Sequence, residues 1–459
     1  MKNIELKQVT SGGCCGPATK KYLDVASTLN KELPIAIIGA GPVGLAAAAH
    51  LANIGERFIL IESGDSVGSN ILNWGHVRLF SPWQYNIDKI AKKVLEDHAW
   101  KAPVLDNLPL GSELVNDYLI PLANLPEIKP FLLLNTKVDF ISKKGLDKMK
   151  SANREKSSFV LYLEQNGVSK RMEARAVIDA TGTWSHPNPI NADNVWTKEE
   201  KELKQHIYYG IPDIKGEQKG KYKGKRVAVV GGGHSAINTI LELSQLDDDV
   251  EISWIMRKKT VEDAYGGEDK DALEARGELG SRIHQLVDAG QVKIYTSFFI
   301  HQLNKTKDGI AITGELEGVE QTLSTFDEII ANTGSRPDFS FEREIRLNID
   351  TATESVEALA PLIDPNLHSC GTVRPHGEEI LRQPEKDFYI VGMKSYGRAP
   401  TFLMATGYEQ VRSIVAHLTG DFESAKKVEL DLPETGVCSV SLVPQNSAQS
   451  CCGTEVSNC

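Results

Sequence analysis

The stretch Ile35–Gly44, which reads IAIIGAGPVG, decides the fold of this 459-residue chain. Its first four residues form a short, β-rich apolar run, which predicts a buried strand. After the glycines, small residues continue to about Ile54, which predicts a helix that Gly55 ends. A second apolar run over Arg57–Ile61 predicts the next strand. Strand, helix and strand make one βαβ unit, so we expect an α/β fold built on a parallel sheet.

The glycines of this stretch have the spacing of a dinucleotide-binding loop. Gly39 permits the tight turn, Gly41 lets the backbone approach a pyrophosphate, and Gly44 lets helix and strand pack closely. The helix N-terminus offers free N–H groups to phosphate oxygens. Glu62 follows 18 residues after Gly44 and can accept hydrogen bonds from ribose hydroxyls. The alternative is a tight βα turn without a ligand.

A second βαβ unit follows the same plan, from Arg226 to Met256. Its loop fits GxGxxA, and its second strand ends in three cations where an NAD site would place an acid. Cations there suit a 2′-phosphate, which favours NADPH over NADH. The alternative is a solvated charge run. The predicted NADPH residues are Gly231, Gly233, His234, Ser235, Ala236, Arg257 and Lys258.

The two loops begin 192 residues apart and have different ribose-reading residues, which implies two different dinucleotides. At this point the chain resembles the two-dinucleotide-binding flavoproteins, over about residues 34–420, and is most similar to their flavin-containing monooxygenase branch. The tripeptide Ala180-Thr181-Gly182 matches the family's crossing between domains, and Asn332-Thr333-Gly334 matches the return crossing. The resemblance implies two Rossmann-like domains, with FAD at the first loop and an inserted domain that binds NADPH.

The resemblance also carries site residues onto this chain. Gly68 and Trp74 stand where the family has a Gly-Gly-x-Trp motif, and Gly392-Met393 stands in place of a late Gly-Asp. Residues 205–209 loosely match its linker fingerprint. The FAD residues expected from the loop and the resemblance are Gly39, Ala40, Gly41, Pro42, Val43, Gly44, Glu62, Trp74, Thr181, Gly182, Gly392 and Met393.

These patterns divide the chain into five segments. We expect an N-terminal arm over 1–33, an FAD domain over 34–202 and 326–425, and an NADPH domain over 203–325. A C-terminal tail over 426–459 shows no periodicity.

Composition limits the function classes. The net charge of −11 excludes a global basic field for nucleic acid or anionic lipid. No apolar run approaches the roughly 18 residues of a membrane span, and no apolar block follows Lys2 as a secretory signal requires. We therefore expect a water-soluble, cytoplasmic protein without nucleic-acid or membrane partners. The sequence leaves open whether it forms a homodimer.

The seven cysteines lie mostly at the two ends of the chain. Adjacent thiols on an arm make a mobile chelate for a soft ion, so Cys14, Cys15, Cys451, Cys452 and Cys459 are candidate ligands for a thiophilic metalloid such as trivalent arsenic. The alternative is that these cysteines are inert. Cys370 lies between His368 and His376 and is a candidate reactive thiol; the alternative is a structural cysteine.

The segments without cysteine help to distinguish disulfide reductases from the other members of the flavoprotein group. Disulfide reductases of this architecture carry a redox pair after the first βαβ unit or in the nucleotide domain, and residues 60–140 and 200–325 contain no cysteine. We therefore expect an NADPH-consuming, FAD-dependent monooxygenase that uses O2 on a soft nucleophile, either trivalent arsenic or an organoarsenical, as in arsenic-resistance flavoproteins. Two alternatives stay open. One is a reductase of a thiol-bound metal(loid), a disulfide or a quinone, and the other is a redox-gated metalloid carrier or sensor.

Overall fold

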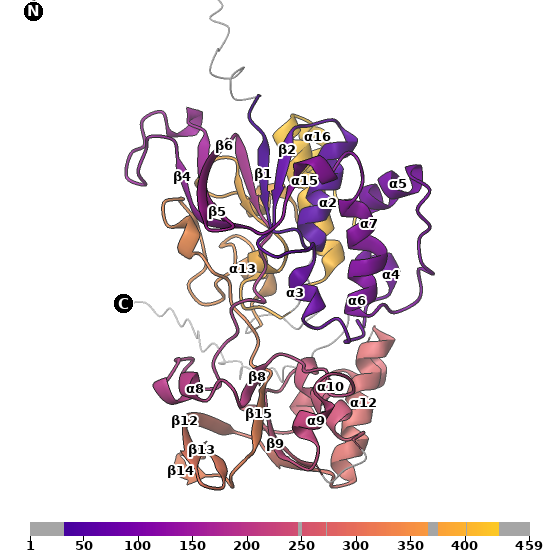
Figure 1. The fold of residues 1–459 in the computed structure, drawn as a ribbon, viewed down its shortest axis with the longest axis vertical. Helices are drawn as coiled ribbons and strands as arrows, with labels where there is room; N and C mark the ends of the chain where they lie inside the picture. Colours follow the sequence, from indigo (N-terminus) through magenta and orange to yellow (C-terminus); the bar gives the residue numbers. More distant parts are fainter. Residues whose placement is uncertain (1–31, 247–249, 272, 366–374, 401, 431–459) are drawn as a thin grey trace, which may run out of the picture.

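The computed structural model describes residues 32–246, 250–271, 273–365, 375–400 and 402–430. All seven cysteines, including Cys370, lie outside these ranges. The chain forms two bodies, each built on a five-stranded parallel sheet (Figure 1).

The first body contains both ends of the described chain. Its sheet has the order β16-β7-β1-β2-β3, with β1 (Ile35–Ile38) in the centre between β7 (Ala176–Asp179) and β2 (Phe58–Ile61). β16 (Phe388–Ile390) and β3 (Leu132–Leu133) form the edges. The glycine loop leads from β1 into α2 (Pro42–Asn53), whose small, buried residues pack against α15 (Met404–Thr419).

The second body has the sheet order β11-β10-β9-β15-β8. Its strands are β8 (Ile207–Tyr209), β9 (Arg226–Val230), β10 (Glu251–Ile255), β11 (Val292–Tyr295) and β15 (Glu328–Ala331). The second glycine loop joins β9 to α10 (His234–Leu243), which packs beside α12 (Glu274–Asp288). The order β10-β9-β15 places this loop at the centre of the sheet, as in the first body.

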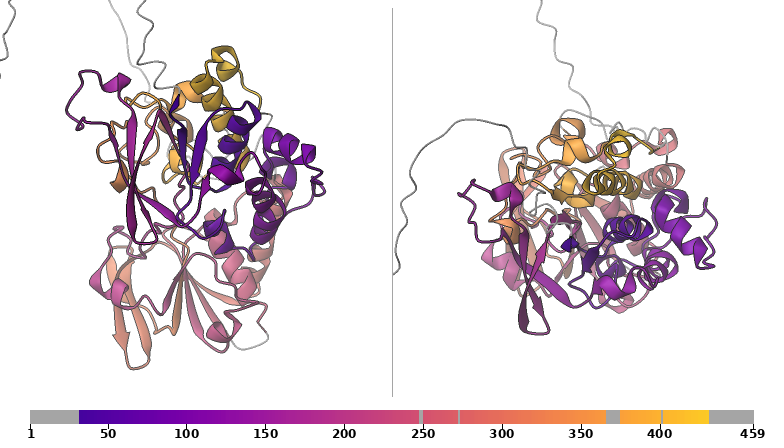
Figure 2. Two further views of the ribbon diagram at one scale, coloured as in Figure 1. Left: turned by 45° about the horizontal axis from the view of Figure 1, so that its top comes forward. Right: turned by 90° about the horizontal axis from the view of Figure 1, so that it is seen from above.

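Each body also carries an antiparallel three-stranded sheet, visible beside the parallel sheets in Figure 2. One consists of β4 (Thr136–Lys143), β5 (Phe159–Gln165) and β6 (Val168–Ala174), and the other of β12 (Phe298–Thr306), β13 (Gly309–Leu316) and β14 (Val319–Thr322). Shorter helices fill the connections: α3 (Ser69–Leu72), α4 (Trp83–Asn86), α5 (Lys89–Asp97), α6 (Gly111–Glu113), a π-helical turn (Leu114–Leu119), α7 (Ile120–Ala123), α8 (Lys198–Glu202), α9 (Lys219–Tyr222), α11 (Glu262–Tyr265), α13 (Ala360–Ile363), α14 (Glu378–Leu381) and α16 (Phe422–Lys426).

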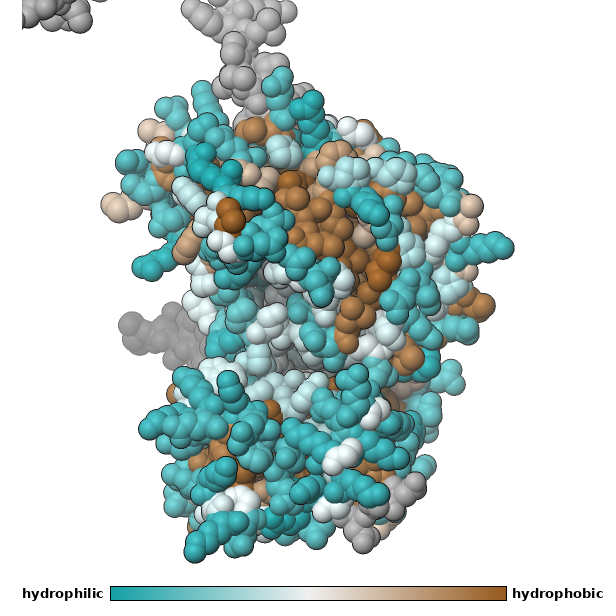
Figure 3. All heavy atoms as spheres, in the orientation of Figure 1, coloured by the Kyte–Doolittle hydropathy of each residue, from teal (hydrophilic) through white to brown (hydrophobic). Residues whose placement is uncertain are grey.

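Two crossings join the bodies, at the tripeptides that the sequence marks. The backbone N–H of Asn188 donates to the carbonyl of Gly334 at 2.9 Å, and the Thr333 hydroxyl donates to the carbonyl of Asn188 at 2.6 Å. The outgoing and returning segments therefore run side by side. Hydrophobic residues gather on the upper body in the face drawn in Figure 3, whereas the lower body is largely hydrophilic there.

The predicted α/β fold with two Rossmann-like units is confirmed. Helix α12 begins at Glu274, and two glycines lie within it. Gly277 and Gly280 obscure the helical pattern. Both are needed because an added Cβ would lie 2.2 Å from the Glu268 carbonyl oxygen and 2.1 Å from that of Tyr265. No helix in the described ranges combines the length and apolarity that crossing a bilayer requires.

Candidate active site

The three glycines of the first loop have two different physical roles. Gly39 has φ of +96°, and an added Cβ would lie 2.7 Å from the Ala180 carbonyl oxygen. At Gly44, an added Cβ would lie 1.9 Å from the Gly39 carbonyl oxygen. Gly41 differs, because it has φ of −78° and its added Cβ would meet no protein atom within 4 Å. Gly39 and Gly44 therefore serve the fold, while Gly41 keeps open a space that the protein leaves empty.

Glu62 lies at the end of β2 and is buried. Its Oε2 accepts a hydrogen bond from the Ala40 backbone N–H at 2.8 Å. Its Oε1 accepts from the Gly64 backbone N–H at 2.7 Å and from the Ser69 hydroxyl at 3.2 Å. The predicted ribose-reading carboxylate thus also ties the glycine loop to the start of α3, a role that the sequence spacing did not indicate.

A cavity of about 490 Å³ opens in front of this loop. Of the predicted FAD residues, those that line it are Gly39, Gly41, Pro42, Val43, Glu62, Trp74, Thr181, Gly182, Gly392 and Met393, while Ala40 and Gly44 are not part of its lining. Gly182 has φ of +68° and open space at its Cβ position. The structure therefore brings together residues from five separate parts of the sequence around one space.

The cavity has a largely apolar wall that sequence reasoning missed. Its additional lining residues include Ile71, Val77, Leu79, Phe80, Trp184, Ile211, Phe402, Leu403 and Met404. The last three lie at the start of α15, whose N-terminus thus faces the cavity. The helix dipole places partial positive charge there. The segment around Val77–Phe80 has no recognisable motif in the sequence.

Lys394 is a fully buried lysine that follows the cavity-lining Met393 and binds two carboxylates. Its ammonium donates to Glu342 at 2.8 Å and also to Asp179. Asp179 in turn accepts from the backbone N–H of Thr181 at 2.9 Å. The opposite charge of Lys394 lowers the pKa of Asp179, and the two carboxylates raise the pKa of Lys394. The network therefore ties both cavity-lining loops, at Thr181 and Met393, to one charge cluster.

The second glycine loop also has one glycine required by packing. Gly231 has φ of +135°, and its added Cβ would lie 2.3 Å from the Asn332 carbonyl oxygen. Gly233, like Gly41, has no protein atom within 4 Å of that position. Ala236 is buried in α10, and His234 and Ser235 at its start line the 490 Å³ cavity. The second loop thus faces the same cavity as the first.

His234 lies between the two bodies, with its ring 6.1 Å from that of Phe80. Burial lowers its pKa to about 4, and the neighbouring charge of Arg276 acts in the same direction. The imidazole is therefore neutral at pH 7, so it can bind a neutral part of a ligand or donate one hydrogen bond without adding a charge.

The two predicted 2′-phosphate readers follow β10 and are exposed. The side chain of Lys258 packs over the second loop, because a Cβ at Gly232 would lie 3.1 Å from Lys258 Cδ. Its ammonium donates to the Asp263 carbonyl. Lys258 therefore lies beside the loop, and Arg257 precedes it in the chain.

The double variant Arg257→Ala, Lys258→Ala is expected to weaken NADPH binding by about tenfold to a hundredfold. The affinity for NADH is expected to change little. Charge-assisted hydrogen bonds contribute about 1.5–3 kcal/mol. The measurement is the KM for each nucleotide, with Lys305→Ala, Lys307→Ala on the distant β12–β13 hairpin as control. Equal losses for both nucleotides would show that these cations do not read the 2′-phosphate.

The residues present fit two dinucleotides. The Cβ positions of Gly41, Gly182 and Gly233 leave empty cradles, and the helices α2 and α10 each begin directly at a glycine loop. The predicted metalloid ligands Cys14, Cys15, Cys451, Cys452 and Cys459 lie outside the described residues. Within the described part of the chain, no group of three or more His, Cys, Asp or Glu side chains could hold a metal ion.

Comparisons with known proteins agree with this geometry. Residues 141–369 match the family model "Pyridine nucleotide-disulphide oxidoreductase", and residues 37–93 match "NAD(P)-binding Rossmann-like domain". The chain is 24% identical to a ferredoxin–NADP reductase of Lysinibacillus sphaericus, covering 75% of this chain and 93% of the relative.

Two solved structures share the fold. A bacillithiol disulfide reductase from Bacillus cereus aligns with a TM-score of 0.60 and 18% identity, covering 84% of this chain and 99% of that one. The FAD-bound cadaverine monooxygenase DfoA of Erwinia amylovora aligns with a TM-score of 0.59 and 13% identity, covering 87% and 98%. The same fold therefore occurs in reductases and in monooxygenases.

Proposed function

We propose that this chain, a member of the pyridine nucleotide-disulphide oxidoreductase family with Rossmann domains for FAD and NAD(P), is a monooxygenase that consumes NADPH and O2. That it is an oxidoreductase with FAD and NADPH as cofactors follows from the family match and the relatives. The non-enzymatic carrier or sensor is thereby set aside. The finer assignment, monooxygenase, rests on the cavity.

The observation that carries the proposal is the chemistry of the cavity wall. Its lining is largely apolar and includes Trp74, Trp184 and Phe402, and the sequence has no cysteine in 60–140 or 200–325. Bound FAD can take a hydride from NADPH and pass electrons to an acceptor. Without a thiol pair at these positions, a diffusible acceptor such as O2 fits better than a disulfide relay.

The chain's own residues prepare a dry, oriented site. Aromatic and aliphatic side chains, among them Trp74, Trp184 and Phe402, shield the cavity from water. The backbone N–H groups at the start of α2 and α10 hold phosphates. The start of α15 places partial positive charge at the same cavity, which favours negative charge on a group bound there.

A reductase is the second candidate, and the ferredoxin–NADP reductase relatives favour it. The deciding measurement is NADPH oxidation by the FAD-loaded protein in air and under argon, with candidate substrates added. The monooxygenase predicts substrate-stimulated oxidation that stops without O2 and yields oxygenated product. Rapid anaerobic turnover with ferredoxin or a quinone, and no oxygenated product in air, would establish the reductase instead.

For the substrate we propose a soft nucleophile, trivalent arsenic or an organoarsenical. The paired thiols of Cys14-Cys15 and Cys451-Cys452, with Cys459, support this proposal because thiolates bind soft ions. In this proposal they capture the substrate and deliver it to the site. Cys370 is proposed as a further reactive thiol.

One variant replaces five cysteines with serine: Cys14, Cys15, Cys451, Cys452 and Cys459. We expect it to raise the KM for a trivalent arsenical and to leave kcat and FAD content unchanged, because the variant loses substrate binding and not the chemical step. The measurement is arsenical-stimulated NADPH oxidation at low and saturating substrate. Cys438→Ser, also in the predicted tail, is the matched control. An unchanged rate at low arsenical would reject the delivery role.

A further inference from the structure

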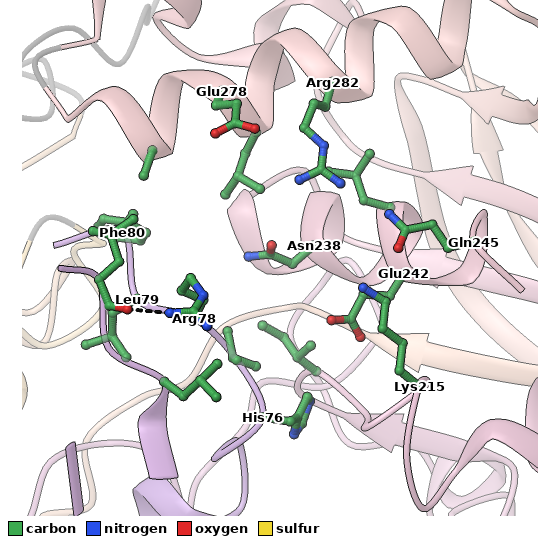
Figure 4. Close-up of a pocket in the computed structure, with 17 residues that line it drawn as sticks. His76, Arg78, Leu79, Phe80, Lys215, Asn238, Glu242, Gln245, Glu278 and Arg282 are labelled. Atoms are coloured by element: carbon green, nitrogen blue, oxygen red, sulfur yellow. Dashed lines mark hydrogen bonds between the residues drawn. The ribbon is translucent and has the colours of Figure 1, made fainter. Parts of the chain in front are cut away.

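A second cavity, of about 380 Å³, lies between the segment His76–Phe80 of the first body and helices α10 and α12 of the second (Figure 4). It adjoins the cavity of about 490 Å³ at the two glycine loops, which we call the cofactor cavity. Six residues line both cavities: Val77, Arg78, Leu79, Phe80, Ile211 and Asn238. A molecule in the second cavity would therefore be separated from the cofactor cavity by a single layer of side chains.

One face of α10 connects the two cavities. His234 and Ser235 line the cofactor cavity, Asn238 lines both, and Glu242 lines the second, as does Gln245 two residues past the end of the helix. The spacing of three or four residues places these side chains on one stripe of the helix. In Figure 4, Asn238 and Glu242 point from α10 toward the segment that carries Arg78.

Two buried polar atoms in this cavity have no hydrogen-bond partner among the described residues. They are Nε2 of His76 and Oε2 of Glu242. A buried polar atom without a partner costs about 1–3 kcal/mol, so such atoms normally meet a ligand or a water molecule. Burial raises the pKa of Glu242, while Lys215 and His76 act in the opposite direction. Both atoms belong to the cavity lining. A bound anion could accept from His76 Nε2 in the tautomer that carries a hydrogen there, whereas the Glu242 carboxylate oxygen needs a donor such as a water molecule.

The remaining lining combines positive charge with an apolar wall. Exposed Arg78, Lys215 and Arg282 face the carboxylates of Glu242 and Glu278. Arg78 donates from Nη1 to the Leu108 carbonyl at 2.5 Å, and the other two cations of the lining are Lys215 and Arg282. The apolar part of the lining consists mainly of Leu79, Leu108, Leu110, Ile211, Leu241 and Leu279. This pattern suits a molecule with an apolar body and one anionic group.

We propose that the second cavity is the substrate chamber and that it admits a small organic anion, with the anionic group at Arg282 and Lys215 and the apolar body against Leu241 and Leu279. The assignment as a substrate chamber rests on the proposed function, because oxidation would occur at the adjoining cofactor cavity. Within that function it selects an organic substrate, such as a trivalent organoarsenical that carries a carboxylate, over inorganic arsenite.

The test is calorimetric titration of the FAD-loaded protein with hexanoate, hexylamine and hexanol, three probes with the same apolar body. Hexanoate is expected to bind most tightly. Arg282→Gln is expected to weaken hexanoate about tenfold, because it removes a charge-assisted contact. Lys305→Gln, an exposed lysine of β12, is the charge-matched control and should change nothing. Equal binding by Arg282→Gln, or tighter binding of hexylamine, would overturn the proposal.

A second variant fills the cavity instead of changing its charge. Ala275→Trp is expected to abolish hexanoate binding while FAD content stays unchanged, because Ala275 is half-buried and lines only the second cavity. Retained binding would place the hexanoate site elsewhere and overturn the proposal. The hexanoate titration is repeated with saturating NADP+. Strict competition between hexanoate and NADP+ would assign the second cavity to the nucleotide and overturn the proposal. Binding is measured without turnover, so failure of the monooxygenase assignment leaves this result readable by itself.

Discussion

Gly41→Val is expected to give a folded protein that purifies without FAD. The φ of −78° at Gly41 suits any residue, and the added Cβ meets no protein atom within 4 Å, so the fold loses nothing. The valine side chain would instead occupy the space through which the loop backbone approaches a pyrophosphate. The measurements are the flavin absorbance per mole of protein and the melting temperature after FAD is removed from both proteins.

Gly44→Ala is the matched control, with the opposite expected outcome. Its Cβ would lie 1.9 Å from the Gly39 carbonyl oxygen, so helix and loop must separate and the free energy of unfolding must fall. A folded Gly41→Val protein with its full complement of FAD would show that this loop does not hold the flavin.

Lys394→Met is expected to cost about 3–5 kcal/mol in the free energy of unfolding, the usual effect of removing one partner from a buried ion pair. Asp179 and Glu342 would remain buried beside each other without a cation. Because Asp179 also accepts from the Thr181 N–H, the loop at Thr181 would shift and FAD would bind less tightly. Urea denaturation and FAD titration measure the two effects.

The pH dependence of stability follows from the same network. The pKa of Asp179 is lowered, so its contribution is present above its usual 3.8 and is lost as pH falls through the lowered value. The pKa of Lys394 is raised, so its contribution is present below its usual 10.5 and is lost as pH rises through the raised value. Burial raises the pKa of Glu342, which opposes stability above its usual 4.5.

A second substitution separates charge from packing. Adding Glu342→Gln to Lys394→Met removes one uncompensated carboxylate, so we expect it to restore part of the lost stability. The charges do not act as one network if the free energies of unfolding add. In that case the double variant would be less stable than Lys394→Met by the full loss that Glu342→Gln causes alone.

Local patterns determined the fold class and the two loops. Ile35–Gly44 and Arg226–Ala236 fix strand, turn and helix within a few residues, because the apolar run and the glycine geometry are local requirements. The glycine spacing also distinguished positions that pack from positions that leave space. Composition and the placement of the seven cysteines were equally readable from the sequence.

Only the tertiary structure decided how distant segments meet. Lys394 and Asp179 lie 215 residues apart and come together because β16 pairs with β7. His76 and Glu242 belong to different bodies, and only the packing of those bodies places both in one cavity. Neither pair has a periodicity or a motif, because its partners are set by sheet order and domain packing. The sequence by itself therefore determined the two glycine loops at which we propose that dinucleotides bind, and tertiary contacts decided which charges lie behind the first loop and which space lies beside the cavity.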